Sequence, residues 1–440
     1  MRPGASSHKT LQPAQAGPLT GLAGDSFPQA TNLRLDSEEP LIVCLQFPKA
    51  TGTEEERHVA RKDMVRLGII GLSSMGYAGM IQDGKVPRCT VTAVCDVDPK
   101  KLEPWKSTKT FTDSTKLIRS GEVDAVLIAT PHYDHTPIGI DALRHGLHVL
   151  VEKPISVHKK DCEKLIAAHT NKSQVFAAMF QQRTDPHHWR IKKLIDDGEL
   201  GELRRTNWII TDWYRTDAYY ASGGWRATWK GEGGGVLLNQ CPHTLDLFQW
   251  ICGMPVRVRA FANFGKYHTV EVEDEITAYL EYPNGATGVF VTTTGEAPGT
   301  NRLEVVGDRG KVVLENDTIT FIRNEQPTSE HCRTAEKFFT KPDRWNIEIP
   351  VEGRGERHVG IIKNFVGAIL DGEPLIAPAE EGIHSVELAN AMLYSSLLGE
   401  TVKLPLDGDA YEAKLNELIA SSKFAKKVVE RPSEGMEASF

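Results

Sequence analysis

The 440-residue sequence lacks the features that mark several specialised classes of protein. No apolar run approaches the roughly 20 residues that a membrane-spanning helix needs, and residues 1–38 lack the basic start and apolar core of a signal peptide. Basic residues do not predominate, since Lys and Arg total 51 against 59 for Asp and Glu, a net charge of −8. A broad basic surface for nucleic acid is therefore excluded. We expect a cytoplasmic protein with no membrane or nucleic-acid partner.

Cysteine is also scarce. The seven cysteines form no CxxC pair and show no zinc-ligand spacing, so we expect reduced thiols and no metal site. The 40% apolar and 25% charged residues are ordinary for a globular protein. The length suits two or three domains with substantial cores.

The sequence divides into four regions by composition and periodicity. Residues 1–63 are rich in Pro, Gly, Ser and Ala, which predicts a disordered extension, and residues 426–440 read as a polar tail. Residues 64–182 alternate apolar runs with helix-length segments, beginning with Val65–Leu72. This alternation predicts parallel βαβ units in a doubly wound sheet, the α/β class.

Residues 183–425 have a different sequence pattern, in which short strand-like runs are separated by turns. They predict an α+β second domain with a largely antiparallel sheet, whose late helices, at about 357–370 and 379–398, pack back on the first domain. Strands are expected at 203–214, 256–264, 275–282, 286–294, 301–306 and 311–322.

A glycine-rich turn follows the first predicted strand. The segment Gly71-Leu72-Ser73-Ser74-Met75-Gly76 approximates the G-x-G-x-x-G turn that places a pyrophosphate on a helix N-terminus. Gly71 and Gly76 fit the first and third glycines. Ser73 stands at the second, where the backbone must approach the pyrophosphate, so its side chain would loosen or reshape the site.

Asp96 ends the second predicted strand, 20 residues after Gly76. A carboxylate there would accept hydrogen bonds from a ribose diol and repel a 2′-phosphate, which favours NAD over NADP. The structural alternative is a turn with two glycines and an ordinary surface aspartate.

Several segments resemble one known family in both order and spacing, the Gfo/Idh/MocA oxidoreductases, over about residues 65–405. They are Val65–Gly76, Ala93–Asp98, Ile128–Pro131 with His135, Gly146–Pro154, Gly198–Leu203 and Gly233–Asp246. The resemblance implies an N-terminal Rossmann domain, a C-terminal domain with an open mixed sheet, and homodimers or homotetramers built through that sheet. It also implies cofactor contacts from Gly71, Ser73, Met75, Gly76, Asp96, Thr130, Pro131, His135, Glu152 and Lys153, with His135 left open between a structural and a cofactor-adjacent role.

Two residues are the expected catalytic groups. Lys153 ends the fifth strand, at the edge where open α/β sheets bind ligands, and the resemblance implies that it contacts the reacting hydroxyl. His243 follows Pro242 at the start of a helix, where the helix dipole keeps the imidazole neutral and able to accept a proton. The alternatives are a solvated lysine and an ordinary polar residue in a first turn.

Position 239 departs from relatives such as inositol dehydrogenase, which carry Asp there. Asn239 can hydrogen-bond a sugar hydroxyl but cannot take a proton. Aromatic residues crowd the segment between Trp208 and Trp229, and their faces suit the C–H faces of sugars, although any one of them can equally belong to the core or a subunit interface. The expected substrate contacts are Asn239, Asp246, Arg183, Trp213, Trp225 and Arg226, with orientation of His243 an alternative for Asp246.

The sequence therefore predicts an NAD-dependent oxidoreductase acting on a ring hydroxyl of a sugar or glycoside. Two alternatives stay open. One is a redox hydrolase that oxidises, eliminates and reduces on bound NAD. The other, suggested by Ser73, is a dinucleotide-binding relative without catalysis.

Overall fold

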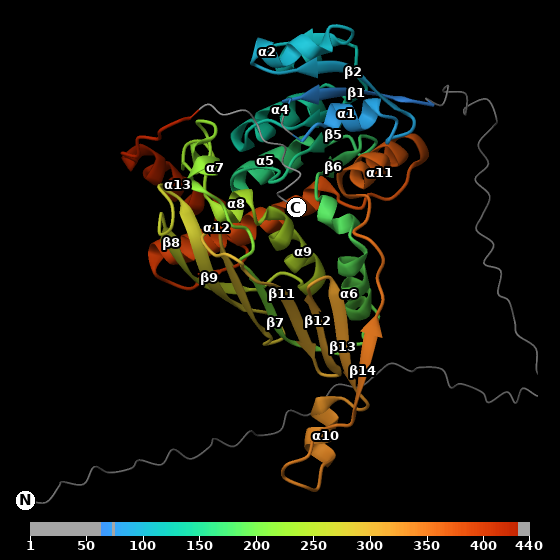
Figure 1. Cartoon of the computed structure of the whole chain (residues 1–440), viewed down its shortest axis with the longest axis vertical. Helices are drawn as coiled ribbons and strands as arrows, with labels where there is room; N and C mark the ends of the chain where they lie inside the picture. Colours follow the sequence, from blue (N-terminus) through green and yellow to red (C-terminus); the bar gives the residue numbers. More distant parts are fainter. Residues whose placement is uncertain (1–62, 73–74, 430–440) are drawn as a thin grey trace, which may run out of the picture. The chain divides into compact units, whose positions relative to one another are not determined.

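The computed structural model describes residues 63–72 and 75–429 (Figure 1). The predictions for the extension before residue 63, for Ser73 and for the tail from residue 430 lie outside the described residues. Within the described part of the chain, no helix is both long enough and apolar enough to cross a bilayer.

In the described residues, six parallel strands form the first sheet, in the order β3-β2-β1-β4-β5-β6. The strands are β1 (Val65–Ile70), β2 (Cys89–Cys95), β3 (Lys109–Phe111), β4 (Ala125–Ile128), β5 (His148–Val151) and β6 (Phe176–Ala178). The helices are α1 (Tyr77–Gln82), α2 (Pro99–Leu102), α3 (Ser114–Ile118), α4 (His132–Arg144) and α5 (Lys159–Ala168), with a 3₁₀ turn, η2 (Glu103–Trp105). Every residue of β4 is buried, as a strand covered on both faces requires. The predicted doubly wound sheet is confirmed, and its strand order reverses between β1 and β4, the point where such sheets bind ligands.

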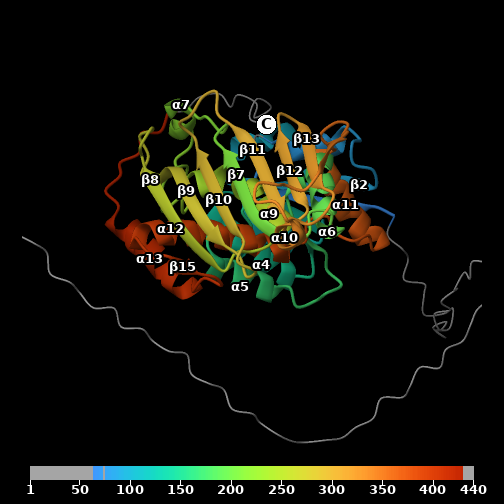
Figure 2. The same cartoon turned by 90° about the horizontal axis from the view of Figure 1, so that it is seen from below.

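The second sheet is mixed, and nine of the described strands form it in the order β14-β13-β12-β11-β7-β10-β9-β8-β15 (Figure 2). Only β7 and β10 pair in parallel among these strands. The strands are β7 (Leu203–Ile210), β8 (Arg257–Phe264), β9 (Glu273–Glu281), β10 (Thr287–Thr293), β11 (Asn301–Gly307), β12 (Gly310–Glu315), β13 (Thr318–Asn324), β14 (Arg344–Ile349) and β15 (Val402–Lys403).

One strand prediction was wrong. The run 311–322 is not a single strand but a hairpin of β12 and β13. Its turn residues Asn316 and Asp317 have φ of 51° and 55°. Asn and Asp tolerate this left-handed conformation better than most residues, and it is what a tight hairpin turn requires.

Of the remaining helices, α6, α9 and α12 lie between the two sheets, α11 lies beside the first sheet and α10 projects beyond β14 (Figure 1). The full set is α6 (Pro186–Asp196), α7 (Asp217–Ala221), α8 (Val236–Asn239), α9 (Pro242–Cys252), α10 (Thr328–Thr334), α11 (Arg357–Asp371), α12 (Gly382–Leu398) and α13 (Gly408–Ser421), with 3₁₀ turns η3 (Gln181–Thr184) and η4 (Ala379–Glu381).

The two sheets have separate apolar cores that the late helices join. Ile361 and Phe365 of α11 are buried in the core of the first sheet. Helix α12 serves both cores, because Val386 belongs to the first and Met392 to the second. The ligand edge of the first sheet is thereby held against helices of the second.

Candidate functional site

The turn after β1 requires glycine at its first position. Gly71 has φ of 89°, and a Cβ there would lie 2.5 Å from the carbonyl oxygen of Ala129. A side chain would therefore push β1 away from the end of β4. Gly76 also has positive φ, 65°, at the start of α1, but open space surrounds it. Met75, between them, is half-buried against the first core.

Asp96 lies at the end of β2 beside this turn, with only 6% of its surface exposed. Its Oδ2 accepts hydrogen bonds from Leu72 N at 2.9 Å and Lys101 Nζ at 3.1 Å, and its Oδ1 accepts one from Asp98 N at 3.0 Å. An ionised carboxylate offers about four acceptor positions, so the three donors among the described residues leave acceptor capacity for a ribose hydroxyl.

The segment after β4 carries an unsatisfied hydroxyl. Thr130 Oγ1 is buried with no hydrogen-bond partner among the described residues, which is typical of a group that a ligand satisfies. Pro131 caps α4. His135 is buried with its ring nitrogens 2.8 Å from the carbonyl oxygens of Thr130 and Pro154, so it ties the ends of β4 and β5 together. With the Gly71 turn and Asp96, these residues fit a dinucleotide at the switch point.

Glu152 and Lys153 follow β5. Glu152 accepts hydrogen bonds from the hydroxyl of Tyr77 and from Lys153 N, the latter at 2.9 Å. Lys153 Nζ donates to the backbone oxygen of Asn239 at 2.9 Å, a contact between the two halves of the chain. Burial lowers the pKa of Lys153 below its ordinary value of 10.5.

His243 lies in the first turn of α9 and is 2% exposed. Its Nδ1 is buried and finds no hydrogen-bond partner in the described chain. Burial, and then the charges of Lys153 and His358, hold the pKa of His243 well below its ordinary value. The ring is therefore neutral at neutral pH, and burial is the main cause.

Two further histidines join this site, and the sequence reasoning missed both. His358 is the second residue of α11, far away in the sequence. Burial, and then the charge of Lys153, lower the pKa of His358 to about 4. His132 opens α4, has a buried Nδ1 without a partner among the described residues, and lies 5.3 Å from the Trp225 ring. The only sequence signal for His132 was its place directly after Pro131 at a strand end.

A hydrogen-bonded network surrounds Asn239. Asn239 Nδ2 donates to the carboxylate of Glu232, and Asn239 Oδ1 accepts from the Tyr219 hydroxyl and from Gln240 Nε2, each at 3.0 Å. The Tyr219 hydroxyl accepts from Arg226 at 2.8 Å. Glu232 was also missed; its one sequence signal is a single charge inside the run Gly231–Gly235.

Arg226 and Trp225 stack at the edge of this network. The Arg226 guanidinium lies 4.7 Å from the Trp225 ring and 4.8 Å from the Tyr219 ring. Arg215 lies between Tyr219 and Trp213, at 5.2 and 5.7 Å. The indole N–H of half-buried Trp213 finds no acceptor among the described residues. Four predicted contacts, Asn239, Trp213, Trp225 and Arg226, thus fall in one cluster.

The structure places Arg183 and Asp246 differently from the prediction. They form a bidentate ion pair, with Nε–Oδ2 and Nη2–Oδ1 both 2.7 Å, and the side chains are 1% and 0% exposed. Glu381 and the carbonyl of Ile376 accept from the remaining Arg183 Nη1 at 2.5 and 3.3 Å. A buried carboxylate needs a paired cation, so both charges are committed to each other rather than to a substrate.

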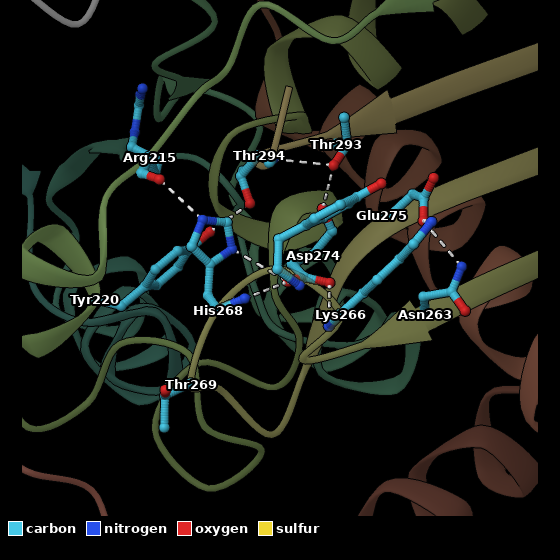
Figure 3. Close-up of polar contacts among 12 residues, drawn as sticks. Arg215, Tyr220, Asn263, Lys266, His268, Thr269, Asp274, Glu275, Thr293 and Thr294 are labelled. Atoms are coloured by element: carbon cyan, nitrogen blue, oxygen red, sulfur yellow. Dashed lines mark hydrogen bonds and ion pairs between the residues drawn. The ribbon is translucent and has the colours of Figure 1, made fainter. Parts of the chain in front are cut away.

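A second buried carboxylate, that of Asp274, bonds to the segment around His268, whose ring contacts the backbone of Arg215 (Figure 3). Asp274 on β9 accepts from the backbone N–H groups of Lys266, Tyr267 and His268 at 2.7–3.1 Å. The ring of His268 lies between Asp274, at 3.1 Å from Nδ1, and the carbonyl of Arg215, at 2.9 Å from Nε2. Asp274 therefore anchors, through His268, the segment that carries Arg215 into the site.

Among the described residues, one group of side chains could hold a metal ion. Potential ligand atoms of His158, Asp161 and Glu412 lie within 4.8 Å of one another. The ammonium of Lys164 already lies 2.7 Å from Asp161 and 3.4 Å from Glu412. Because this cation neutralises the carboxylates, we assign no metal to the group.

Comparison with known proteins matches both halves of the chain. Residues 65–180 match an oxidoreductase family with an NAD-binding Rossmann fold, and residues 188–313 match the GFO/IDH/MocA C-terminal domain. Myo-inositol 2-dehydrogenase of Thermotoga maritima is 24% identical over 356 residues, which cover 77% of this chain and 98% of that protein. Levoglucosan dehydrogenase of Pseudarthrobacter phenanthrenivorans is 23% identical over 389 residues, covering 78% and 98%.

Among solved structures, the WlbA dehydrogenase of Bordetella pertussis in complex with NADH and UDP-GlcNAcA has a TM-score of 0.64 at 23% identity, over 78% of this chain and all of that chain. At this identity the likeness establishes the fold. Both halves match in order, so the chain belongs to the Gfo/Idh/MocA oxidoreductase family and carries that family's NAD-binding Rossmann domain.

Proposed function

We propose that the protein is an NAD-dependent dehydrogenase that oxidises a ring hydroxyl of a sugar or glycoside. The observation that carries the proposal is that Lys153, from the first half of the chain, hydrogen-bonds one turn before His243 of the second half and acts on it electrostatically. Lys153 donates to the backbone of Asn239, four residues before His243, and its charge depresses the His243 pKa. The named relatives that act on inositol and levoglucosan support a polyhydroxylated substrate.

The chain's own groups divide the proton chemistry between them. Lys153 polarises the substrate hydroxyl through its ammonium, and the neutral imidazole of His243 takes the hydroxyl proton. Trp213 and Trp225 supply faces for the sugar ring, and Arg226 and Asn239 supply hydrogen bonds to its hydroxyls. Arg183 and Asp246 serve the same reaction indirectly, by fixing α9 and therefore His243.

The Gly71 turn, Asp96, Thr130 and Glu152 would hold the dinucleotide. When bound, NAD supplies the acceptor for the hydride that leaves the oxidised carbon. The Asp96 carboxylate supports NAD over NADP, since a 2′-phosphate would meet a negative charge. The NADH in the WlbA structure agrees with this preference.

We also propose that the protein acts in the cytoplasm as a homo-oligomer built through the open face of the second sheet. Large apolar side chains lie exposed there, with Phe261 at 61% and Tyr279 at 42%. Their strand neighbours Ala260 and Leu280 are buried on the opposite face, because side chains alternate along a strand. Exposed aromatic faces of this kind mark interfaces.

The test is purified protein with NAD and a panel of glucosides, galactosides, N-acetylhexosaminides, free sugars and inositols. NADH fluorescence and released sugar are followed in the same wells. We expect NADH with one substrate class and its loss in Lys153→Met and His243→Gln. Released sugar without net NADH would instead establish the redox hydrolase. No signal in either channel, with no NAD binding, would establish an inactive relative.

A further inference from the structure

The carboxylate of Glu232 is buried in the middle of the proposed site. It is 1% exposed, and its two oxygens accept from Ala227 N, at 2.6 Å, and from Asn239 Nδ2. The backbone around it is closely packed, since a Cβ on Gly231 would lie 2.2 Å from the Trp225 carbonyl oxygen, and Glu232 N donates to the carbonyl of Thr228 at 2.9 Å. Glu232 is thus held in place by its own backbone.

The first sheet anchors this segment as well. Tyr133 and His132 both contact this segment: the Tyr133 hydroxyl donates to the carbonyl of Trp229 at 3.0 Å, and the His132 ring lies 5.3 Å from the Trp225 ring. Both residues belong to α4, directly after the cofactor edge of β4. The position of the Glu232 carboxylate is therefore fixed relative to the cofactor-binding half.

A carboxylate only accepts hydrogen bonds, and this sets the direction of the whole network. Facing Glu232, the Asn239 amide must present Nδ2 to it, which turns Oδ1 toward Tyr219 and Gln240. Both acceptor positions of Oδ1 are then filled by Tyr219 and Gln240. The group that Asn239 keeps for a ligand is its second N–H, a donor.

We propose that Glu232 is a positioning residue that fixes Asn239 as a hydrogen-bond donor to the substrate. This inference rests on the proposed function and adds one feature of the substrate. The sugar hydroxyl that contacts Asn239 accepts a hydrogen bond from it through an oxygen lone pair. The same carboxylate places a negative charge among the cations Lys153 and Arg226, on both of which it acts electrostatically.

The test exchanges the members of the pair. Glu232→Gln lets the amide at 239 turn over, and Asn239→Asp sets two carboxylates against each other. Each is expected to raise KM for the sugar about tenfold or more, with NAD affinity unchanged, because a buried polar group then faces a mismatched partner. The double variant E232Q/N239D restores one donor and one acceptor between the two side chains but leaves no N–H at 239 for the sugar, so we expect it to recover folding stability while the sugar KM stays raised.

Two results would overturn the inference: a sugar KM in E232Q equal to that of wild type, or a double variant whose sugar KM returns to that of wild type although position 239 has lost its N–H. Glu232→Asp guards against misfolding, since it keeps the charge and should retain more activity than E232Q. If wild type forms no NADH with any panel member, the proposed function fails separately. Calorimetry of the same sugars with the NADH complex then decides the inference. It is overturned if E232Q binds the sugar as tightly as wild type does, and also if neither wild type nor any variant binds a sugar.

Discussion

The buried carboxylates of Asp246 and Glu232 have different partners: the first pairs with a cation and the second with neutral groups. Asp246 faces a guanidinium that matches it with two bonds of 2.7 Å. Glu232 faces a neutral amide and one peptide N–H, while the nearby cation Arg226 bonds to Tyr219 instead. In the region around Asp246, which we call the closed region, each charge is paired with an opposite charge. In the region around Glu232, the open region, charged and polar groups keep donors or acceptors that a ligand can use.

This difference separates stability from function in residues that sequence alone had grouped together. A closed ion pair is strongly destabilising to break but offers nothing to a ligand. A network whose members retain donors and acceptors can be completed by a substrate. Variants in the closed region should change the free energy of unfolding, and variants in the open region should change rates.

The largest effect is expected in the open region, at His243. Glutamine keeps polarity but cannot act as base, so kcat/KM should fall by about 10²–10⁴-fold with little change in stability. In wild type, kcat/KM should fall as pH drops through the depressed pKa of His243, below its ordinary 6.5, because protonation removes the base. A pH–rate profile checks this, and an acid limb that persists unchanged in H243Q would refute the assignment.

In the closed region, Arg183→Met should cost roughly 3–5 kcal/mol of unfolding free energy, because it leaves Asp246 buried without its cation. The double variant R183M/D246L removes both charges and should recover most of that loss. Urea denaturation measures both. A single variant within about 1 kcal/mol of wild type would show that Asp246 is not a closed site.

Asp274 extends the comparison to a carboxylate closed by backbone donors. Asp274→Asn turns an N–H₂ group toward the N–H donors of Lys266, Tyr267 or His268, so we expect a loss of about 1–3 kcal/mol in stability. NAD affinity should not change. Thermal unfolding and a NAD titration on one preparation check both expectations, and weakened NAD binding would contradict them.

Asp96 stands between the two cases, because its three donors among the described residues leave acceptor capacity for a ligand. Asp96→Asn should weaken NAD binding about tenfold, or ~1.4 kcal/mol, and weaken NADP binding less, since the repelling charge is gone. Fluorescence titration with both cofactors measures the ratio. An unchanged NAD to NADP ratio would exclude Asp96 as the selecting residue.

Local patterns were enough to predict five strands of the first sheet and part of the site, but not the short edge strand β3 (Lys109–Phe111). A fully apolar run such as Ala125–Ile128 predicts a strand that is buried on both faces. The carboxyl ends of the strands in a parallel sheet lie at one edge. Lys153 at such an end, and His243 after Pro242, could therefore be assigned before their contact through Asn239 was known.

Contacts made by tertiary folding could not be predicted in this way. Arg183 and Asp246 pair across 63 residues of sequence, and nothing local distinguishes a committed charge from an available one. His358 reaches the site only because α11 returns to the first sheet. Glu232 required knowing which carboxylate the Asn239 amide would face.

The return of α11 also has a consequence for synthesis. The six strands of the first sheet are complete by Ala178, but their core includes Ile361 and Phe365, made about 180 residues later. A chain emerging from the ribosome therefore carries the cofactor-binding sheet with an uncovered apolar patch until α11 follows. The half of the protein that is made first is among the last to be finished, and a truncated copy ending before residue 357 leaves that patch open to aggregation.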